Sequence, residues 1–388
     1  MINPKVMNIP NKKIIVAAIA TVLIICAVGT AIVLSSDNSE KGLYQLDAKV
    51  SIVNMGQCSA TPGVIMAIDQ MYTDYYGEPV NDNLTIDDAK ADSAFWNEYC
   101  VWSPMITEKS DGTFNVTINT AVNGNEVVNI PVCDTAVIMG TMYSETLYFL
   151  ICAANNVEPY SAESFANENV KNYLNSTITG GMQYSYYEQY DVEYMLKCVN
   201  SSGYFDLGTN STSTVDSEKL TQALQSANSR GNDGTVYFGS GRVINTSDIY
   251  NSSTGPCIKT GSYYAFFSPS TFSDIYSSIE CMGLIMGFSH YVINEVIENI
   301  QLNLYKVYCS VQELTAGKTP EKAYWETYAG KAVNTTMAKN ILDFLGFDSS
   351  LLDGAEHDTE SLLKDNPSYL IFFTNDTRSM DEKMRTNT

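Results

Sequence analysis

The sequence predicts an α/β protein whose large folded region follows a single N-terminal transmembrane helix. Three observations support this prediction: an uncharged run over residues 14–34, two strand–polar loop–helix units within residues 46–159, and a helical region that begins near Ser273. Repeated units of this kind are typical of α/β folds rather than all-β folds. About 350 residues follow the uncharged run, too many for one minimal domain, so we expect two lobes or domains.

The uncharged run, IIVAAIATVLIICAVGTAIVL, has the length of a membrane-spanning helix, because 1.5 Å per residue gives roughly 30 Å. Three lysines precede it and the acidic stretch SSDNSEK follows it, so the short N-terminus is expected inside the cell. A cleaved secretory signal is the alternative, but its apolar stretch is usually only about 7 to 15 residues long. We therefore expect the cytoplasmic segment 1–13, a retained signal-anchor at 14–34, a linker at 35–45, and all later residues outside the cell.

The chain is strongly acidic, with 22 Lys and Arg against 44 Asp and Glu and a formal net charge of −22. Phosphate backbones would repel such a polyanion, which excludes nucleic acid as a partner. Hydrophobic residues make up 45% of the chain and aromatic residues 11%, enough to bury a core, so the chain is not a disordered stalk.

Cysteines and glycosylation sequons fit an extracellular address. Eight of the nine cysteines lie outside the membrane segment, and either disulfides or buried thiols would explain them. Sequons for N-glycosylation begin at Asn83, Asn115, Asn175, Asn200, Asn210, Asn245, Asn251, Asn334 and Asn375. These sequons mark expected surface loops of a glycoprotein.

The first strand–loop–helix unit begins with an expected strand over 48–55. A polar loop, GQCSAT, follows, and Pro62 stands at a favourable first position of a helix that ends near Gly77.

The second unit begins with expected strands over 113–122, 126–131 and 135–139, the first two joined by an Asn-Gly turn typical of hairpins. Gly140 and Thr141 then lead into a helix over 143–154. Both units therefore place small polar residues between a strand and a helix start.

The remaining elements are expected in this order: a helix to about 199, a helix over 217–229, strands over 235–238 and 262–267, and helices from 273 onward. Apolar residues spaced by three and four between Ile293 and Leu314 predict a long packed core helix, with Gly317 after its end. Thr319 and Pro320 are expected to open another helix, and Gly330 and Gly346 to close two more.

No catalytic motif is visible. The chain has two histidines and no HExxH, GxSxG or Walker sequence, so we expect a protein that is not an enzyme and needs no cofactor. Residues 77–88 resemble a degenerate calcium loop, but Pro79 and Lys90 stand where carboxylates are needed, so we expect no metal site. Arg242 follows a Gly-Ser-Gly turn and could clamp an anionic group.

The motifs KVSIVNM with TPGVIMAIDQMY, CDTAVIMGTMYSETLYFL and GPCIKTGSYYAFFSP resemble ABC-importer solute-binding proteins, in the type II group of nitrate, sulfonate and taurine binders. A signal-anchored form is similar to those of archaea. The resemblance implies two α/β lobes with a ligand between them: lobe I from residues 46–159 with 261–388, and lobe II from residues 160–260. It also implies an ABC permease in the membrane as partner.

Helix N-termini supply free N–H groups, and open α/β sheets bind ligands at the carboxyl ends of their strands. The expected ligand-binding residues are therefore Cys58, Ser59, Thr61, Gly140, Thr141 and Arg242, for a small and possibly anionic ligand. Two alternatives remain open: a surface glycoprotein with a structural or interaction role, and an extracellular hydrolase.

Overall fold

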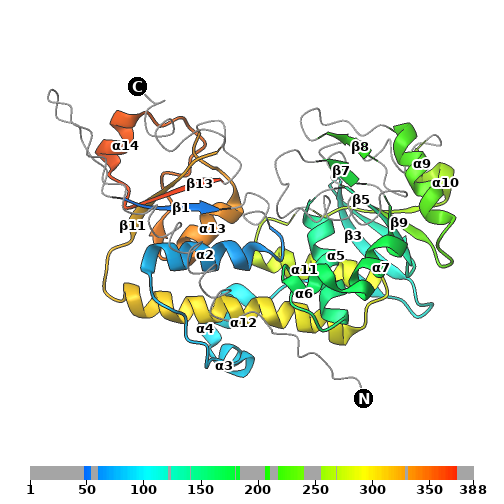
Figure 1. Ribbon diagram of the computed structural model, residues 1–388, viewed down its shortest axis with the longest axis horizontal. Helices are drawn as coiled ribbons and strands as arrows, with labels where there is room; N and C mark the ends of the chain where they lie inside the picture. The colour runs from blue at the N-terminus through cyan, green and yellow to red at the C-terminus, as the bar shows by residue number, and fades with distance from the viewer. Residues whose placement is uncertain are drawn as a thin grey trace, which may run out of the picture.

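Two parallel four-stranded sheets form the framework of the computed structural model (Figure 1). The structure describes residues 48–53, 60–120, 124–139, 141–179, 181–183, 206–209, 217–239, 255–267, 269–327 and 331–373. The expected transmembrane segment 14–34 lies outside these residues. Within the described part, no helix is both long enough and apolar enough to cross a bilayer.

The first sheet has the strand order β1-β13-β11-β12 and joins the beginning of the described chain to its end. Its strands are β1 (Lys49–Val53), β13 (Tyr369–Phe373), β11 (Glu321–Trp325) and β12 (Phe347–Asp348). All three pairings are parallel. Every residue of β13 is buried, as expected for a central strand of a parallel sheet covered on both faces.

The second sheet has the order β10-β9-β5-β6, also with parallel pairings throughout. Its strands are β10 (Tyr263–Ala265), β9 (Thr235–Phe238), β5 (Thr135–Ile138) and β6 (Ile178–Thr179). The two central strands, β5 and β9, are buried along their whole length. We call the first sheet with its covering helices the first lobe, and the second sheet with its helices the second lobe.

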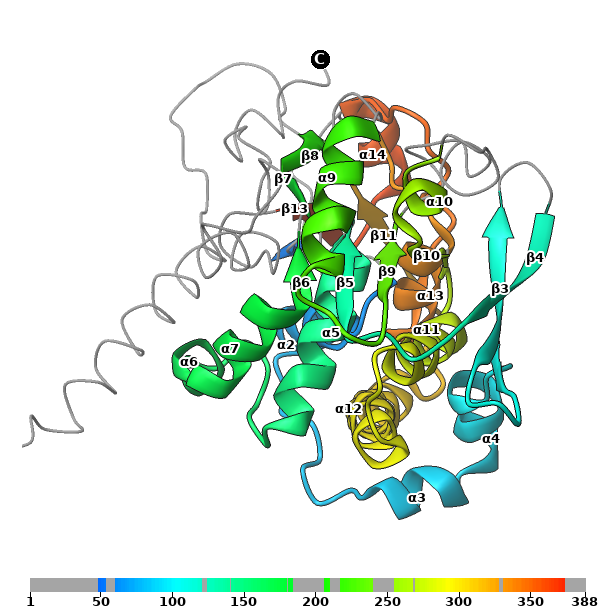
Figure 2. The same ribbon diagram turned by 90° about the vertical axis from the view of Figure 1, so that its right-hand side faces the viewer.

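The remaining described strands form two smaller sheets. An antiparallel sheet contains β2 (Ile106–Glu108), β3 (Phe114–Thr120) and β4 (Gly124–Ile130), and its β3–β4 hairpin stands out from the body of the molecule (Figure 2). The pairing of Thr120 with Gly124 confirms the hairpin predicted at the Asn-Gly turn. β7 (Gly181–Gln183) and β8 (Asp206–Thr209) form a parallel pair.

Helices surround and connect the two lobes. Before the second sheet come α2 (Val64–Tyr76), α3 (Ile86–Ala91), α4 (Ser93–Phe95) and the π-helix η2 (Trp96–Cys100). The second lobe carries α5 (Thr141–Ala154), α6 (Ala162–Ala166), α7 (Glu168–Thr177), α9 (Ser217–Asn228), α10 (Pro256–Thr260) and α11 (Phe272–Ile285). The first lobe ends with α13 (Thr336–Phe344) and α14 (Thr359–Asp365).

One long helix, α12 (His290–Thr315), runs along both lobes (Figure 1). Its 26 residues give a length of about 39 Å, and it packs on α2 and α3 as well as on α5 and α11. The Ser289 side chain caps its start, and the Ile293, Ile300 and Val311 side chains are among those it buries. This confirms the long core helix predicted from the apolar spacing.

The sheet pairings differ from the predicted division into lobes. The N-terminal strand does share a sheet with the C-terminal strands, but residues 135–138 and 263–265, assigned to lobe I with β1, pair within the second sheet. The physical reason is the parallel register of β9, which places β5 on one side and β10 on the other.

One predicted helix is wrong. The Thr319-Pro320 pair precedes strand β11 rather than a helix, because Ala323, Tyr324 and Trp325 are buried between β12 and β13. The cysteines follow the buried-thiol alternative where they are described: Cys100, Cys133, Cys152, Cys257, Cys281 and Cys309 are free, and only Cys309 is not fully buried.

Candidate functional site

The starts of α2 and α5 meet between the two lobes. α2 follows β1 of the first sheet and α5 follows β5 of the second, so each helix begins after the carboxyl end of a parallel strand. The point of contact is Glu145, in the first turns of α5, which lies against Gly63 at the start of α2. Side chains from both strand–loop–helix units are thereby brought together, as the ligand-site prediction requires.

Glu145 is buried, with 2% of its surface exposed. The Tyr160 hydroxyl donates a hydrogen bond of 2.5 Å to its Oε1 atom. Burial raises the pKa of Glu145 above its ordinary value, while the Thr61 hydroxyl, the Tyr160 hydroxyl and the Gly63 N–H each act in the opposite direction by hydrogen bonding. Burial is the largest effect, so the neutral carboxyl is favoured more here than in water.

Gly63 leaves room for the carboxyl group. A Cβ atom at this position would lie 2.8 Å from the Glu145 carboxyl carbon, closer than side chains approach. The backbone of Gly63 has a φ of −69° and a ψ of −6°, which any residue can adopt. Space rather than conformation therefore requires glycine at this place.

Tyr160 reaches Glu145 from a backbone conformation that is rare for a large side chain. Its φ is +56°, in the left-handed region that costs non-glycine residues free energy. Its N–H donates to the Tyr148 hydroxyl at 3.1 Å, and that hydroxyl lies 2.8 Å from the Ser164 hydroxyl. The surrounding hydrogen bonds and the edge-on contact with the Tyr148 ring hold Tyr160 in place.

Two buried polar atoms at this junction lack a hydrogen bond of ordinary geometry among the described residues. They are Thr61 Oγ1 and Glu145 Oε2, although the Thr61 hydroxyl is near enough to lower the pKa of the carboxyl group. Thr61 is fully buried. A hydroxyl and a carboxyl oxygen side by side could together accept and donate a hydrogen bond to a bound group or a water molecule.

The predicted site residues are only partly within the described structure. Thr61 lies at the junction, and Thr141 is the first residue of α5, about one turn before Glu145. Cys58, Ser59, Gly140 and Arg242 lie outside the described residues, so their roles stay predictions. The position of Thr61 beside the second unit agrees with the expected meeting of the two loops.

Sequence reasoning did not single out Glu145 or Tyr160. A signal for Glu145 was present, because it is the one charged residue in the otherwise uncharged helix sequence TMYSETLYFLICAA. An acid inside an apolar helix is rarely buried without a specific partner. Tyr160 had no such signal, since its conformation and its contact with α5 depend on tertiary structure.

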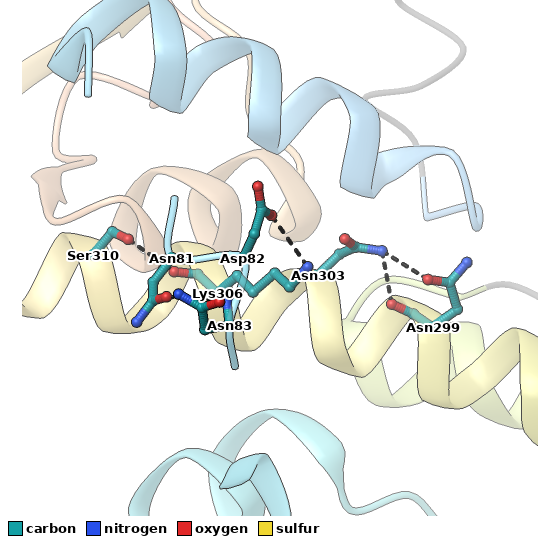
Figure 3. Close-up of polar contacts among 7 residues, drawn as sticks. All are labelled: Asn81, Asp82, Asn83, Asn299, Asn303, Lys306 and Ser310. Atoms are coloured by element: carbon teal, nitrogen blue, oxygen red, sulfur yellow. Dashed lines mark hydrogen bonds and ion pairs between the residues drawn. The ribbon is translucent and has the colours of Figure 1, made fainter. Parts of the chain in front are cut away.

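A lysine side chain forms an ion pair with the turn that resembled a calcium loop. Figure 3 shows Lys306 of α12 reaching the turn, where its Nζ lies 3.3 Å from Asp82 Oδ1. Within the turn the Asn83 N–H donates to Asn81 Oδ1 at 3.0 Å. Across the described residues there is no cluster of three or more acidic, histidine or cysteine side chains able to hold a metal ion. The ammonium group supplies the positive charge that faces Asp82.

The two histidines are not among the residues that form the junction. His290 is the exposed first residue of α12, and His357 Nε2 lies 3.0 Å from Asp353 Oδ1 in the loop before α14. Neither histidine belongs to α2 or α5, the helices that build the junction.

No family model and no curated protein matches this sequence. The fold is partly similar to periplasmic binding proteins of known structure. CeuE of Helicobacter pylori, in its Ni-His complex, is 13% identical with a TM-score of 0.45, over 70% of this chain and 77% of that chain. A periplasmic binding protein from Veillonella parvula is 13% identical with a TM-score of 0.42, over 69% and 77%. A periplasmic heme-binding protein from Pseudomonas aeruginosa is 11% identical with a TM-score of 0.41, over 66% and 76%.

Proposed function

We propose that this protein is an extracellular solute-binding protein that holds a small ligand between its two lobes and delivers it to an ABC importer. The observation that carries the proposal is the contact between the starts of α2 and α5 at Glu145. Through this contact, the carboxyl ends of strands from two separate parallel sheets face the same region. Ligands of open α/β proteins bind outside the carboxyl ends of the strands. The segments that follow β1, β5 and β9 carry Ser59, Gly140 and Arg242, respectively.

The junction narrows the class of ligand. The sequence favoured an anionic group at the start of α2, but Glu145 places an acidic group of the chain itself there. A ligand carboxylate at this position would have to displace the Glu145 carboxyl group, which fills the space beside Gly63. The free acceptor Glu145 Oε2 and the Thr61 hydroxyl instead favour a ligand that presents a hydrogen-bond donor, such as an amine or hydroxyl group.

The signal-anchor at 14–34 fits this function, because it would tether the lobes outside the cell beside a permease. The competing proposal is a surface glycoprotein without a small ligand. Exposed sequon asparagines at Asn83 and Asn115 support the glycoprotein alternative, since glycans need accessible acceptors.

A thermal-shift screen of the full-length chain in detergent tests the proposal. The panel should contain amines, amino acids, sugars, oxyanions and metal chelates, each at concentrations up to millimolar. A ligand at 100 times its Kd should stabilise the folded state by about 2.7 kcal/mol, which is easily detected. The result would favour the glycoprotein alternative if no compound class shifts the unfolding temperature and no permease and ATPase genes lie beside this one.

A further inference from the structure

We infer that Glu145 is a positioning residue that ties the two lobes together at the ligand site, by holding the start of α2 against α5. Its relevance to a ligand rests on the proposed function, whereas the tie itself is independent of any ligand. Two observations carry the inference: the Glu145 carboxyl group lies directly against Gly63 of the other lobe, and the Tyr160 hydroxyl donates to Oε1.

The contact between Glu145 and Gly63 joins helices that belong to different lobes. α2 packs on β1 of the first lobe, while α5 packs on α11 of the second lobe, and α12 runs beneath both (Figure 1). The starts of α2 and α5 also touch each other directly, because the Glu145 carboxyl group fits against Gly63 with no room for a side chain there.

The carboxyl group lies at the N-terminus of α2, against Gly63. The N-cap residue of α2 is Gly63, which has no side chain to accept a hydrogen bond from the first turn. An acidic side chain at a helix N-terminus usually comes from the same chain segment and stabilises the free N–H groups there. Here the acidic side chain beside the start of α2 comes from the other lobe, so separation of the lobes would remove it from this helix end.

Tyr160 fixes the carboxyl group in the orientation that reaches Gly63. The rare backbone conformation of Tyr160 is held by the Tyr148 hydroxyl, which receives its N–H. Strained conformations of this kind persist where the surrounding structure over-determines them, often at functional sites. None of the three groups that contact Glu145 carries a formal charge, so the tie depends on hydrogen bonds and packing rather than on an ion pair.

Hydrogen–deuterium exchange on the full-length chain tests the inference. The variants are Glu145→Ala, Glu145→Gln and Tyr160→Phe, and the matched control is Glu158→Gln, which changes an exposed carboxylate in the same lobe. The readout is exchange in the peptide that contains Gly63, compared with peptides from β13 and α9. Small-angle scattering of the same samples reports the separation of the lobes.

We expect Glu145→Ala to speed exchange at Gly63 roughly 10- to 100-fold, with little change in β13 or α9, and to increase the radius of gyration. Glu145→Gln keeps an acceptor oxygen and should restore most of the protection, Tyr160→Phe should give an intermediate rate, and the control should match the wild type. If Glu145→Ala does not fold, exchange at Gly63 in Glu145→Gln and Tyr160→Phe tests the inference instead.

Unchanged exchange at Gly63 in folded Glu145→Ala and Tyr160→Phe overturns the inference. An equal rise in all peptides also overturns it, since that pattern shows general destabilisation and no local tie. None of these measurements needs a ligand, so failure of the tie and failure of the solute-binding proposal are separate results.

Discussion

Gly63 and Glu145 form a contact in which the absence of a side chain on one residue makes room for the carboxyl group of the other. The two residues come from different lobes and lie far apart in the sequence. The Gly63 backbone has an ordinary helical conformation that any residue can adopt. The contact with Glu145, and not the backbone conformation, therefore explains why this position is a glycine.

Replacing Gly63 by alanine should therefore destabilise the protein by about 1–3 kcal/mol, the usual cost of overpacking a tight site. Urea unfolding of the full-length chain measures the change. In Gly63→Ala with Glu145→Ala the added methyl group has space, so the loss should be smaller than the sum of the two single losses. Strictly additive losses would show that the two residues are not in contact.

The buried carboxyl group of Glu145 should make stability depend on pH. Its pKa in the folded state is raised, chiefly by burial, above the ordinary value near 4.5 that it has in the unfolded chain. The folded state therefore binds the proton more tightly, and this contribution is fully present below the unfolded pKa and is lost as pH rises through the folded pKa.

Glu145→Gln is neutral at every pH and keeps a similar shape. Its stability relative to the wild type should rise between acidic and neutral pH, and urea titrations at a series of pH values between 4 and 8 measure the difference. A constant difference across the series would show that the Glu145 pKa is not raised.

Local sequence patterns predicted most elements correctly, because the signals lie within the elements themselves. Gly77 with its φ of +71° ends α2, and the apolar spacing from Ile293 gives α12. Strand β11 was missed because its identity comes from pairing with β12 and β13, which follow it in the chain, while the nearby Thr319-Pro320 pair is a typical helix start.

The same distinction applies to the site. The sequence placed Thr61 and the start of α5 in one site through a general rule about strand ends and helix starts. It could not place Glu145 at the start of α2, because that contact depends on how two sheets are arranged. The pairing of β5 with β9 could not be predicted from local patterns for the same reason, since the two strands are about a hundred residues apart in the sequence.

Cys309 should be the first of the described cysteines to react with an alkylating reagent. It is half-buried, whereas Cys100, Cys133, Cys152 and Cys257, like Cys281, are fully buried. Burial raises the pKa of the Cys309 thiol, and only the thiolate is a nucleophile, so the reaction should be slow at pH 7 and accelerate toward pH 9 and above.

Time-resolved labelling with iodoacetamide, followed by peptide mass spectrometry, measures the order of reaction. Denatured protein provides the control, because all six thiols should then react at similar rates. A described cysteine that stays unlabelled even after denaturation without reductant would be in a disulfide, contrary to the structure.

Once a ligand is identified, Thr61→Ala and Arg242→Ala should each weaken its binding. Loss of one buried hydrogen bond to a charged ligand group costs on the order of 1.5–3 kcal/mol, or about 10- to 150-fold in affinity. Thr61 has a buried hydroxyl without a full hydrogen bond at the junction. Arg242, in the segment after β9, is predicted to bind an anionic group of the ligand, distinct from the donor group that faces Glu145.

Titration calorimetry of the two variants measures the loss, with Thr107→Ala, at an exposed position of strand β2, as the control that should bind normally. Circular dichroism before each titration confirms that the variants are folded. A ligand with a donor group should lose affinity in Thr61→Ala, since the variant removes a buried hydroxyl that can accept a hydrogen bond at the junction. Normal affinity in both variants would place the ligand site elsewhere than the junction of α2 and α5.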